Sequence, residues 1–133
     1  MDYPSPLYNP TSVLVVEDNR DAADSLARFL RVSAGFYVRV AYDGKTAVRM
    51  ALDDPPIAVV CDIVLPMKNG LTVAEQLIAQ LDEKPLLVAV TAFGDVCSEV
   101  MARAAGFHHY LVKPADPFEI ERLITEHVDG RLE

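Results

Sequence analysis

Five side chains in the sequence could together bind a metal ion and a phosphoryl group. They stand within two residues of the end of one of the apolar runs VLVV, IAVVC, LLVAV and HYLV, and they are Glu17, Asp18, Asp62, Thr91 and Lys113. A single carboxylate in such a place is more often a turn or helix cap than a functional group. The sequence indicates a functional site only because three carboxylates, one hydroxyl and one ammonium are all placed in this way.

The chemistry of these groups is complementary. Neighbouring carboxylates repel one another, so they favour a site that holds a cation. Oxygen ligands suit Mg²⁺, which usually binds one or two carboxylates together with water and phosphate oxygens. A lysine neutralises an incoming phosphoryl oxygen, and a threonine hydroxyl donates to another. Asp62 is the candidate nucleophile, because a carboxylate can attack phosphorus in line with the departing group.

These residues can meet only if the apolar runs are strands of one sheet. The runs have the length and the β-branching of strands, and they span residues 12–17, 37–41, 57–62, 86–92 and 109–113. Three of them are apolar nearly throughout, as expected for parallel strands covered on both faces. The run YVRVA (37–41) alternates more, which favours an edge strand.

Helical patterns separate the runs. Capping residues and apolar spacing predict five helices, which begin near Asn19 or Asp21, Asp43, Gly70, Asp95 and Asp116. Their expected buried stripes are Ala22, Leu26, Phe29 and Leu30; Ala47, Val48, Ala51 and Leu52; Leu71, Ala74, Leu77, Ile78 and Leu81; Val96, Val100, Met101 and Ala104; and Ile120, Leu123, Ile124 and Val128. This alternation predicts an α/β fold with helices on both faces of a parallel sheet. Ligands of such sheets bind at the carboxyl ends of the strands.

Composition limits the classes of function. The chain has 133 residues, 51% of them hydrophobic, and its net charge of −8 disfavours direct binding to nucleic acid. No apolar run approaches the roughly 18–20 residues that span a membrane, and no signal peptide opens the chain. Cys61 and Cys97 lack the spacing of a metal site, so we expect free thiols in a cytoplasmic protein.

The chain divides into three parts. Residues 1–10 contain three prolines and no periodic pattern, so we expect a flexible arm there. Residues 11–129 form one domain, and residues 130–133 form a C-terminal tail.

Four motifs resemble those of the receiver domain of two-component response regulators, namely VLVVEDN (13–19), DIVLPMKNG (62–70), VTA (90–92) and YLVKP (110–114). The resemblance covers about residues 11–128. The stretches 17–26 and 106–114 further resemble receivers attached to hybrid histidine kinases and their stand-alone relatives. The resemblance implies a flavodoxin-like fold, with five parallel strands in the order 2-1-3-4-5 and five helices.

The resemblance also implies a magnesium-dependent phosphoacceptor site. Asp62 would accept a phosphoryl group from a phosphohistidine. Asp18, Asp62 and the main-chain carbonyl of Val64 would bind Mg²⁺, and Glu17 would help through a water molecule.

The remaining site residues would respond to the phosphoryl group. Lys113 would pair with the Asp62 carboxylate and then with the phosphoryl group, which Thr91 and the main chain of Ala92 would also bind. Tyr110 would rotate inward behind Thr91 and remodel the face made by the fourth helix, fifth strand and fifth helix. The peptide before Pro114 would be cis.

The implied function is a signalling switch that catalyses only its own phosphorylation and slow dephosphorylation. Its partners would be a histidine kinase or a histidine phosphotransfer protein, together with a downstream protein that the sequence does not identify. Met1 and the short N-terminal arm favour a single-domain regulator, and a receiver excised from a hybrid histidine kinase is the alternative.

Two other classes fit the residues less well. A flavin- or nucleotide-binding domain would need a Gly-rich or Ser/Thr-rich phosphate loop where EDNRD (17–21) stands. A hydrolase with an aspartyl nucleophile would need a second acid near Asp62, where Val64 stands.

Three residues depart from the family pattern. Lys68 stands where the family commonly has an apolar residue, so we expect a solvent-exposed charge near the site. Val64 and Phe93, two residues beyond Asp62 and Thr91, have no polar group to steer a hydrolytic water. We therefore predict slow self-dephosphorylation.

Overall fold

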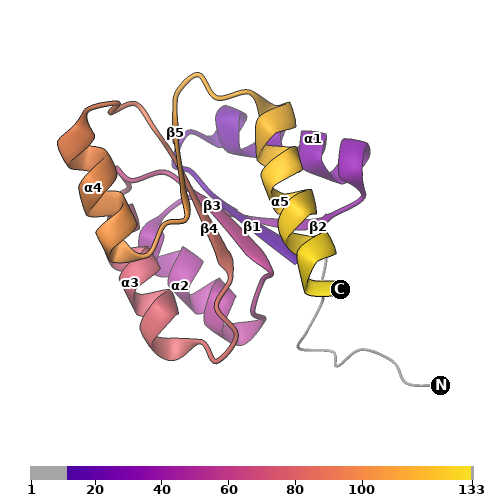
Figure 1. Cartoon of the computed structure of the whole chain (residues 1–133), viewed down its shortest axis with the longest axis horizontal. Helices are drawn as coiled ribbons and strands as arrows, with labels where there is room; N and C mark the ends of the chain where they lie inside the picture. The colour runs from indigo at the N-terminus through magenta and orange to yellow at the C-terminus, as the bar shows by residue number, and fades with distance from the viewer. Residues whose placement is uncertain (1–11, 133) are drawn as a thin grey trace.

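The computed structural model describes residues 12–132, in which five strands and five helices alternate (Figure 1). The strands are β1 (Ser12–Val16), β2 (Tyr37–Ala41), β3 (Ala58–Cys61), β4 (Leu86–Thr91) and β5 (His109–Val112). The helices are α1 (Arg20–Ala34), α2 (Gly44–Asp53), α3 (Gly70–Gln80), α4 (Val96–Ala105) and α5 (Pro117–Leu132). The predicted arm, residues 1–10, lies outside the described residues.

The five strands are parallel and lie in the order β2-β1-β3-β4-β5, which confirms the predicted fold. β1 lies between two neighbours, so that Val15 stands opposite Val40 of β2 and Val60 of β3. The chain proceeds from β1 to β2 on one side and returns to β3 on the other. The strand order therefore reverses between β1 and β3, and the ends of these strands carry the predicted acids.

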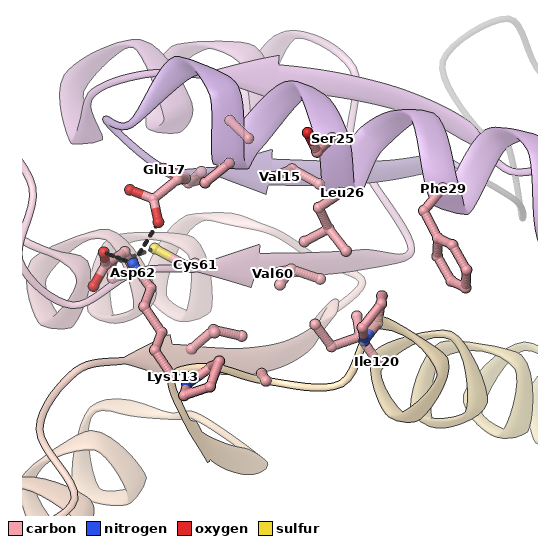
Figure 2. A pocket seen from close by; sticks show the side chains of 17 residues that line it. Val15, Glu17, Ser25, Leu26, Phe29, Val60, Cys61, Asp62, Lys113 and Ile120 are labelled. Carbon is pink, nitrogen blue, oxygen red and sulfur yellow. Dashed lines mark hydrogen bonds and ion pairs between the residues drawn. The ribbon is translucent and has the colours of Figure 1, made fainter.

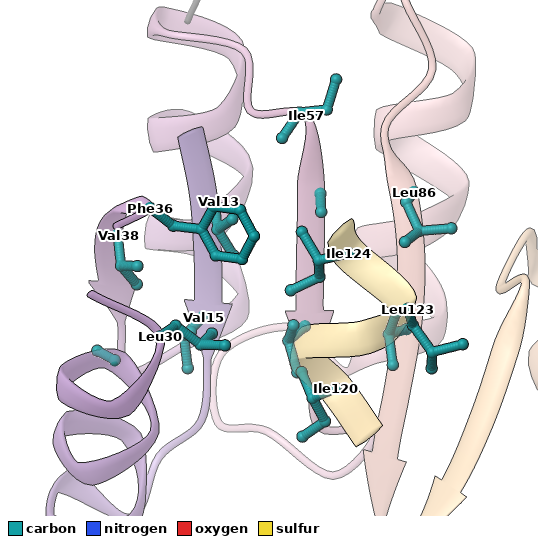
Figure 3. Packing of buried hydrophobic residues seen from close by; sticks show 14 of the residues in the cluster. Val13, Val15, Leu30, Phe36, Val38, Ile57, Leu86, Ile120, Leu123 and Ile124 are labelled. Atoms are coloured by element: carbon teal, nitrogen blue, oxygen red, sulfur yellow. The ribbon is translucent and has the colours of Figure 1, made fainter. Parts of the chain in front are cut away.

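Each face of the sheet has its own apolar core, because successive side chains of a strand point to opposite faces. Val13 and Val15 of β1 pack with α1 and α5, and Figure 3 shows Ile124 of α5 over this face. On the opposite face, Leu14 and Val16 pack with α2, α3 and α4. Full burial of one such side chain contributes about 1.5–3 kcal/mol. The two cores thus hold the sheet from both sides.

Helix starts are fixed by polar side chains that accept a hydrogen bond from a main-chain amide of the first turn. These caps are Asn19 for α1, Asp43 for α2, Asn69 for α3 and Asp95 for α4. Asp116 accepts from the amide of Phe118 at 2.9 Å at the start of α5. Since α1 and α3 follow the loops that carry Asp18 and Asp62, their caps define where these loops end.

The prediction for the buried stripe of α4 is wrong. Ala102 is the residue that this helix buries, whereas Val96, Val100 and Met101 are 77%, 60% and 58% exposed. Ala104 is exposed as well. The spacing of the apolar residues places them on one side of the helix without showing which way that side points. Because α4 packs against α3 and β5 at the edge of the sheet, it has little apolar surface to cover.

Smaller differences occur in α1 and α2. The buried residues of α1 are Ala23, Ala27 and Leu30. Ala22 is exposed, while Leu26 and Phe29 are half-buried, so the buried stripe is rotated from the predicted one. Leu52 of α2 is 36% exposed rather than inward.

The last helix confirms its predicted stripe and runs further than expected. All four apolar residues of that stripe are buried, namely Ile120, Leu123, Ile124 and Val128. α5 continues to Leu132, into the stretch predicted as a tail. Within residues 12–132, no helix combines the length and the apolar character needed to cross a bilayer.

Candidate phosphoryl and metal site

Three carboxylates meet at the end of the sheet where the strand order reverses. Glu17 and Asp18 follow β1, and Asp62 follows β3. One carboxylate oxygen from each lies within 4.8 Å of the other two. Glu17 and Asp62 are each 8% exposed, whereas Asp18 is open to solvent. The predicted acids are thus brought together, with two of them largely shielded from water.

Lys113 joins the two buried acids. Its Nζ donates to Glu17 Oε1 at 2.5 Å and to Asp62 Oδ2 at 2.8 Å (Figure 2). The other oxygens also have partners, because the Asn19 amide donates to Glu17 Oε2 at 3.0 Å and the Val64 amide to Asp62 Oδ1 at 3.2 Å. Segments from three parts of the chain are therefore linked through one ammonium group.

The pKa directions follow from these contacts. The adjacent carboxyl group of Glu17, by hydrogen bonding and by its charge, raises the pKa of Asp18. Burial favours a higher pKa for Glu17, but hydrogen bonds from Lys113 and the Asn19 amide outweigh it and lower the pKa. Burial opposes the charge of Lys113, but its bonds to Asp62 and Glu17 raise the pKa of the ammonium. Among the residues that the structure describes, no cationic side chain pairs with Asp18, which lies on the side of the cluster that is open to solvent.

The loop after Asp62 runs against main chain on two sides. A Cβ at Gly70 would lie 2.2 Å from the Asp62 carbonyl oxygen, and one at Gly44 would lie 1.8 Å from the Lys68 carbonyl oxygen. Both are far closer than real Cβ atoms come to other atoms. The Gly70 amide donates to the Ile63 carbonyl at 2.7 Å, and the Gly44 amide donates to the Pro66 carbonyl at 3.2 Å. Glycine is therefore required at both positions for the loop to close.

Lys68 is less free than expected. Its Nζ donates to Gln76 Oε1 of α3 at 2.7 Å, and the residue is half-buried. The expectation of a solvent-exposed charge is therefore wrong, because α3 offers a side-chain partner one turn and a half beyond its start. Val64 is 57% exposed and Phe93 is 51% exposed, so apolar groups stand beside the site as predicted.

The residues expected to bind the phosphoryl group lie at the neighbouring strand ends. Thr91 is buried at the end of β4, and its Oγ1 accepts from the Phe93 amide at 3.5 Å. Ala92 follows it and is exposed. The Tyr110 hydroxyl donates to the Phe93 carbonyl. The peptide between Lys113 and Pro114 is cis. The roles assigned to these residues stay predictions.

Sequence reasoning missed a cluster beside the acids. The Tyr42 hydroxyl donates to Asp24 Oδ1 at 2.6 Å, and the Arg20 guanidinium carbon lies 4.0 Å from the centroid of the Tyr42 ring. These contacts join the first turns of α1 to the residue after β2. Taken singly, each looks like a surface residue, and only the adjacency of β1 and β2 brings them together.

Other reactive side chains take structural positions. Cys61 is buried in the core on the α2 and α3 side of the sheet. Nδ1 of His108 accepts from the Leu87 amide at 3.0 Å. Within residues 12–132, the close group of three or more potential metal ligands consists of Glu17, Asp18 and Asp62.

Fold and site define the chain as a doubly wound α/β domain with an acidic cluster and a lysine at its switch point. The model of the response regulator receiver domain family matches residues 13–125, and the chain belongs to this family. It is 39% identical over 116 residues to the response regulator MprA of Mycolicibacterium vanbaalenii and 39% identical over 113 residues to that of Mycobacterium avium. These matches cover 87% and 85% of this chain but 48% and 47% of the relatives. The chain thus spans about half the length of the curated relatives it matches.

Solved structures show the same architecture. The receiver domain of the sensor histidine kinase PA1611 from Pseudomonas aeruginosa is 29% identical, with a TM-score of 0.79 over 90% of this chain and 98% of that one. That structure has a magnesium ion coordinated in its active-site cleft. A CheY-like receiver domain protein from Methanospirillum hungatei, 23% identical with a TM-score of 0.82, covers 90% of this chain and 94% of its own and shares the fold.

Proposed function

We propose that this receiver domain is a phosphoacceptor switch in which Asp62 takes a phosphoryl group from a histidine kinase or a histidine phosphotransfer protein. The observation that carries the proposal is the pairing of Asp62 with Lys113 inside the acidic cluster. Of the three acids, Asp62 alone is buried, paired with the lysine and placed directly after the central strand β3. Glu17 shares the lysine, and each of the two acids has its second oxygen held by a main-chain amide.

The transfer is an in-line displacement at phosphorus. A carboxylate oxygen of Asp62 forms the new P–O bond, the P–N bond of the phosphohistidine breaks, and the electron pair stays on the imidazole nitrogen. The ammonium group of Lys113 exchanges its bond to the Asp62 carboxylate for a bond to a phosphoryl oxygen. The Thr91 hydroxyl and the Ala92 amide donate to the others. The domain catalyses only this step and its own slow dephosphorylation.

The residues fit a magnesium site. The three carboxylates offer oxygen atoms within 4.8 Å of one another, and the neighbouring carboxyl group of Glu17 raises the pKa of Asp18. Asp18, Asp62 and the Val64 carbonyl would hold Mg²⁺ directly, with Glu17 acting through water. When bound, Mg²⁺ supplies the positive charge that offsets the acids and attracts phosphoryl oxygens.

The output is a change in a protein-binding face. Tyr110 is engaged with the Phe93 carbonyl, two residues beyond Thr91, so a Thr91 hydroxyl drawn to phosphate alters the surroundings of that tyrosine. α4, β5 and α5 adjoin these residues and form the face that responds. A full change from about 1:99 to 99:1 requires roughly 5.5 kcal/mol of differential stabilisation.

The proposed context is a single-domain cytoplasmic regulator whose target is another protein. An excised receiver of a hybrid histidine kinase is the alternative context. The charge of −8 argues against direct contact of this chain with nucleic acid.

Acetyl phosphate and Mg²⁺ test the proposal, with intact mass as the readout. We expect the parent chain to gain one phosphoryl group, and chelation of Mg²⁺ to prevent the gain. Asp62→Asn should abolish it, while Asp82→Asn, a change at an exposed loop residue, should leave it intact. A gain of mass that survives Asp62→Asn would place the acceptor elsewhere and refute the assignment.

A further inference from the structure

An apolar cavity of about 540 Å³ lies between α1 and α5, beside the acidic cluster (Figure 2). Leu26 and Phe29 of α1 form one wall, Val60 of β3 forms the floor, and Pro117 and Ile120 of α5 form the opposite wall. The phosphoacceptor chemistry uses only the charged end of this space.

Small side chains keep the space open. Ala22, Ala23 and Ser25 of α1 line it, and Ala115 lines it from the segment before α5. The helices meet instead further along, where Phe29 and Phe118 of α5 pack edge to face with centroids 4.9 Å apart. Beside this contact, the small side chains of Ala22, Ser25 and Ala115 do not fill the space between the two helices.

The charged groups at the end of the cavity are already engaged with one another. Among its lining residues, those with charged side chains are Glu17, Asp62 and Lys113. Lys113 bonds to both acids, and main-chain amides occupy their remaining oxygens. A charged ligand would have to break these pairs or bury an unpaired charge, and both are costly. The cavity is thus complementary to an uncharged molecule.

We propose that this cavity is a binding site for a compact, uncharged, largely apolar molecule such as an aromatic ring system. Its volume falls within the range of about 300–1,000 Å³ typical of small-molecule sites, and apolar walls with few polar groups are typical of them too. The site shares Glu17, Asp62 and Lys113 with the proposed phosphoacceptor site, but the binding proposal does not require Asp62 to accept a phosphoryl group.

Titration of the full chain with indole, followed by amide and methyl NMR, tests the site. We expect saturable shifts confined to residues around the cavity, including Leu26, Phe29 and Ile120, with a Kd of about 1 mM or tighter, as for a ligand of this size. Tryptamine and indole-3-propionate carry opposite charges on the same ring system. Both should bind at least about ten times more weakly than indole, because the paired charges leave no partner for theirs.

Substitutions that fill the cavity provide the decisive comparison. Ser25→Phe and Ala115→Phe fill it from opposite sides, and each should weaken indole binding at least about tenfold. Ser25 is exposed, so its replacement leaves the fold intact. Ser33→Phe is the matched control on the same helix, since Ser33 does not line the cavity, and it should bind indole like the parent.

Three results would overturn the proposal. They are shifts that do not saturate or that spread evenly over both faces of the sheet, charged analogues that bind as tightly as indole, and equal loss of binding in Ser25→Phe and Ser33→Phe.

Discussion

Replacement of Gly70 by alanine tests how the main chain after β3 holds the phosphoacceptor. The new Cβ would lie 2.2 Å from the Asp62 carbonyl oxygen and 2.8 Å from Ile63 Cα. Both atoms belong to the main chain, so no side chain can turn away to make room. The carbonyl, or the start of α3, must move by close to 1 Å to reach the shortest distance seen for real Cβ atoms.

The expected cost is the difference of two effects. Overpacking of a tight site costs about 1–3 kcal/mol. The lower entropy of the unfolded alanine chain returns about 0.4–1 kcal/mol. We therefore expect Gly70→Ala to lower the free energy of unfolding by about 1–2 kcal/mol. Since the clash is with Asp62 itself, phosphorylation by acetyl phosphate should also slow.

Urea unfolding measures the effect, with an unchanged slope as evidence that both proteins unfold in the same way. Gly130→Ala in α5 is the matched control, because a Cβ there has nothing within 4 Å. Gly130 lies in the last turn of α5, so that change should raise stability by no more than the value of about 0.5–1 kcal/mol for a helix interior. If Gly70→Ala proved as stabilising as Gly130→Ala, the close approach inferred for the Asp62 carbonyl would be wrong.

Three further predictions concern the acids Asp18 and Glu17 and the exposed apolar residue Val64. Asp18→Asn should stabilise the cation-free protein by about 0.5 kcal/mol, because it removes repulsion from Glu17, and it should abolish the rise in melting temperature caused by Mg²⁺. The lowered pKa of Glu17 means that the stability it contributes is complete above the ordinary carboxyl pKa of 4.5 and is lost as the pH falls through its folded value. Glu17→Gln should therefore flatten the acid limb of a urea-stability profile, and an unaltered limb would contradict the assignment. Val64→Asn should shorten the phosphoryl lifetime several-fold, measured by loss of the added mass, because it introduces a group that can orient water.

The sequence predicts the order of elements well because each signal is local. Strand runs and capping residues such as Asn19 and Asp95 are read within a few positions, and the structure has them in place. The acids also follow from local signals, since residues at the carboxyl ends of parallel strands meet at one edge. The motif VLVVEDN then indicated the family to which the chain belongs.

The structural features that the sequence does not predict depend on contacts between segments that are distant in the chain. The exposure of Val100 and Met101 is decided by how α4 sits against the sheet edge, which periodicity does not encode. The pairing of Lys68 with Gln76 depends on the path of the loop before α3. The bond from Lys113 to Glu17 joins residues 96 positions apart, and only the packing of the sheet brings both acids within reach of one ammonium group.

The shallow seating of α4 makes it the least anchored helix of its face. α3 buries Gly70, Val73, Ala74 and Leu77, whereas α4 buries Ala102 alone. Segments with few buried apolar contacts open locally at a small fraction of the global unfolding free energy. Amide hydrogens of α4 should therefore exchange with deuterium well before those of α3, even in the fully native protein. A partner whose binding requires α4 to tilt or to fray therefore needs to provide little binding free energy for that change. The rest of the domain can remain rigid.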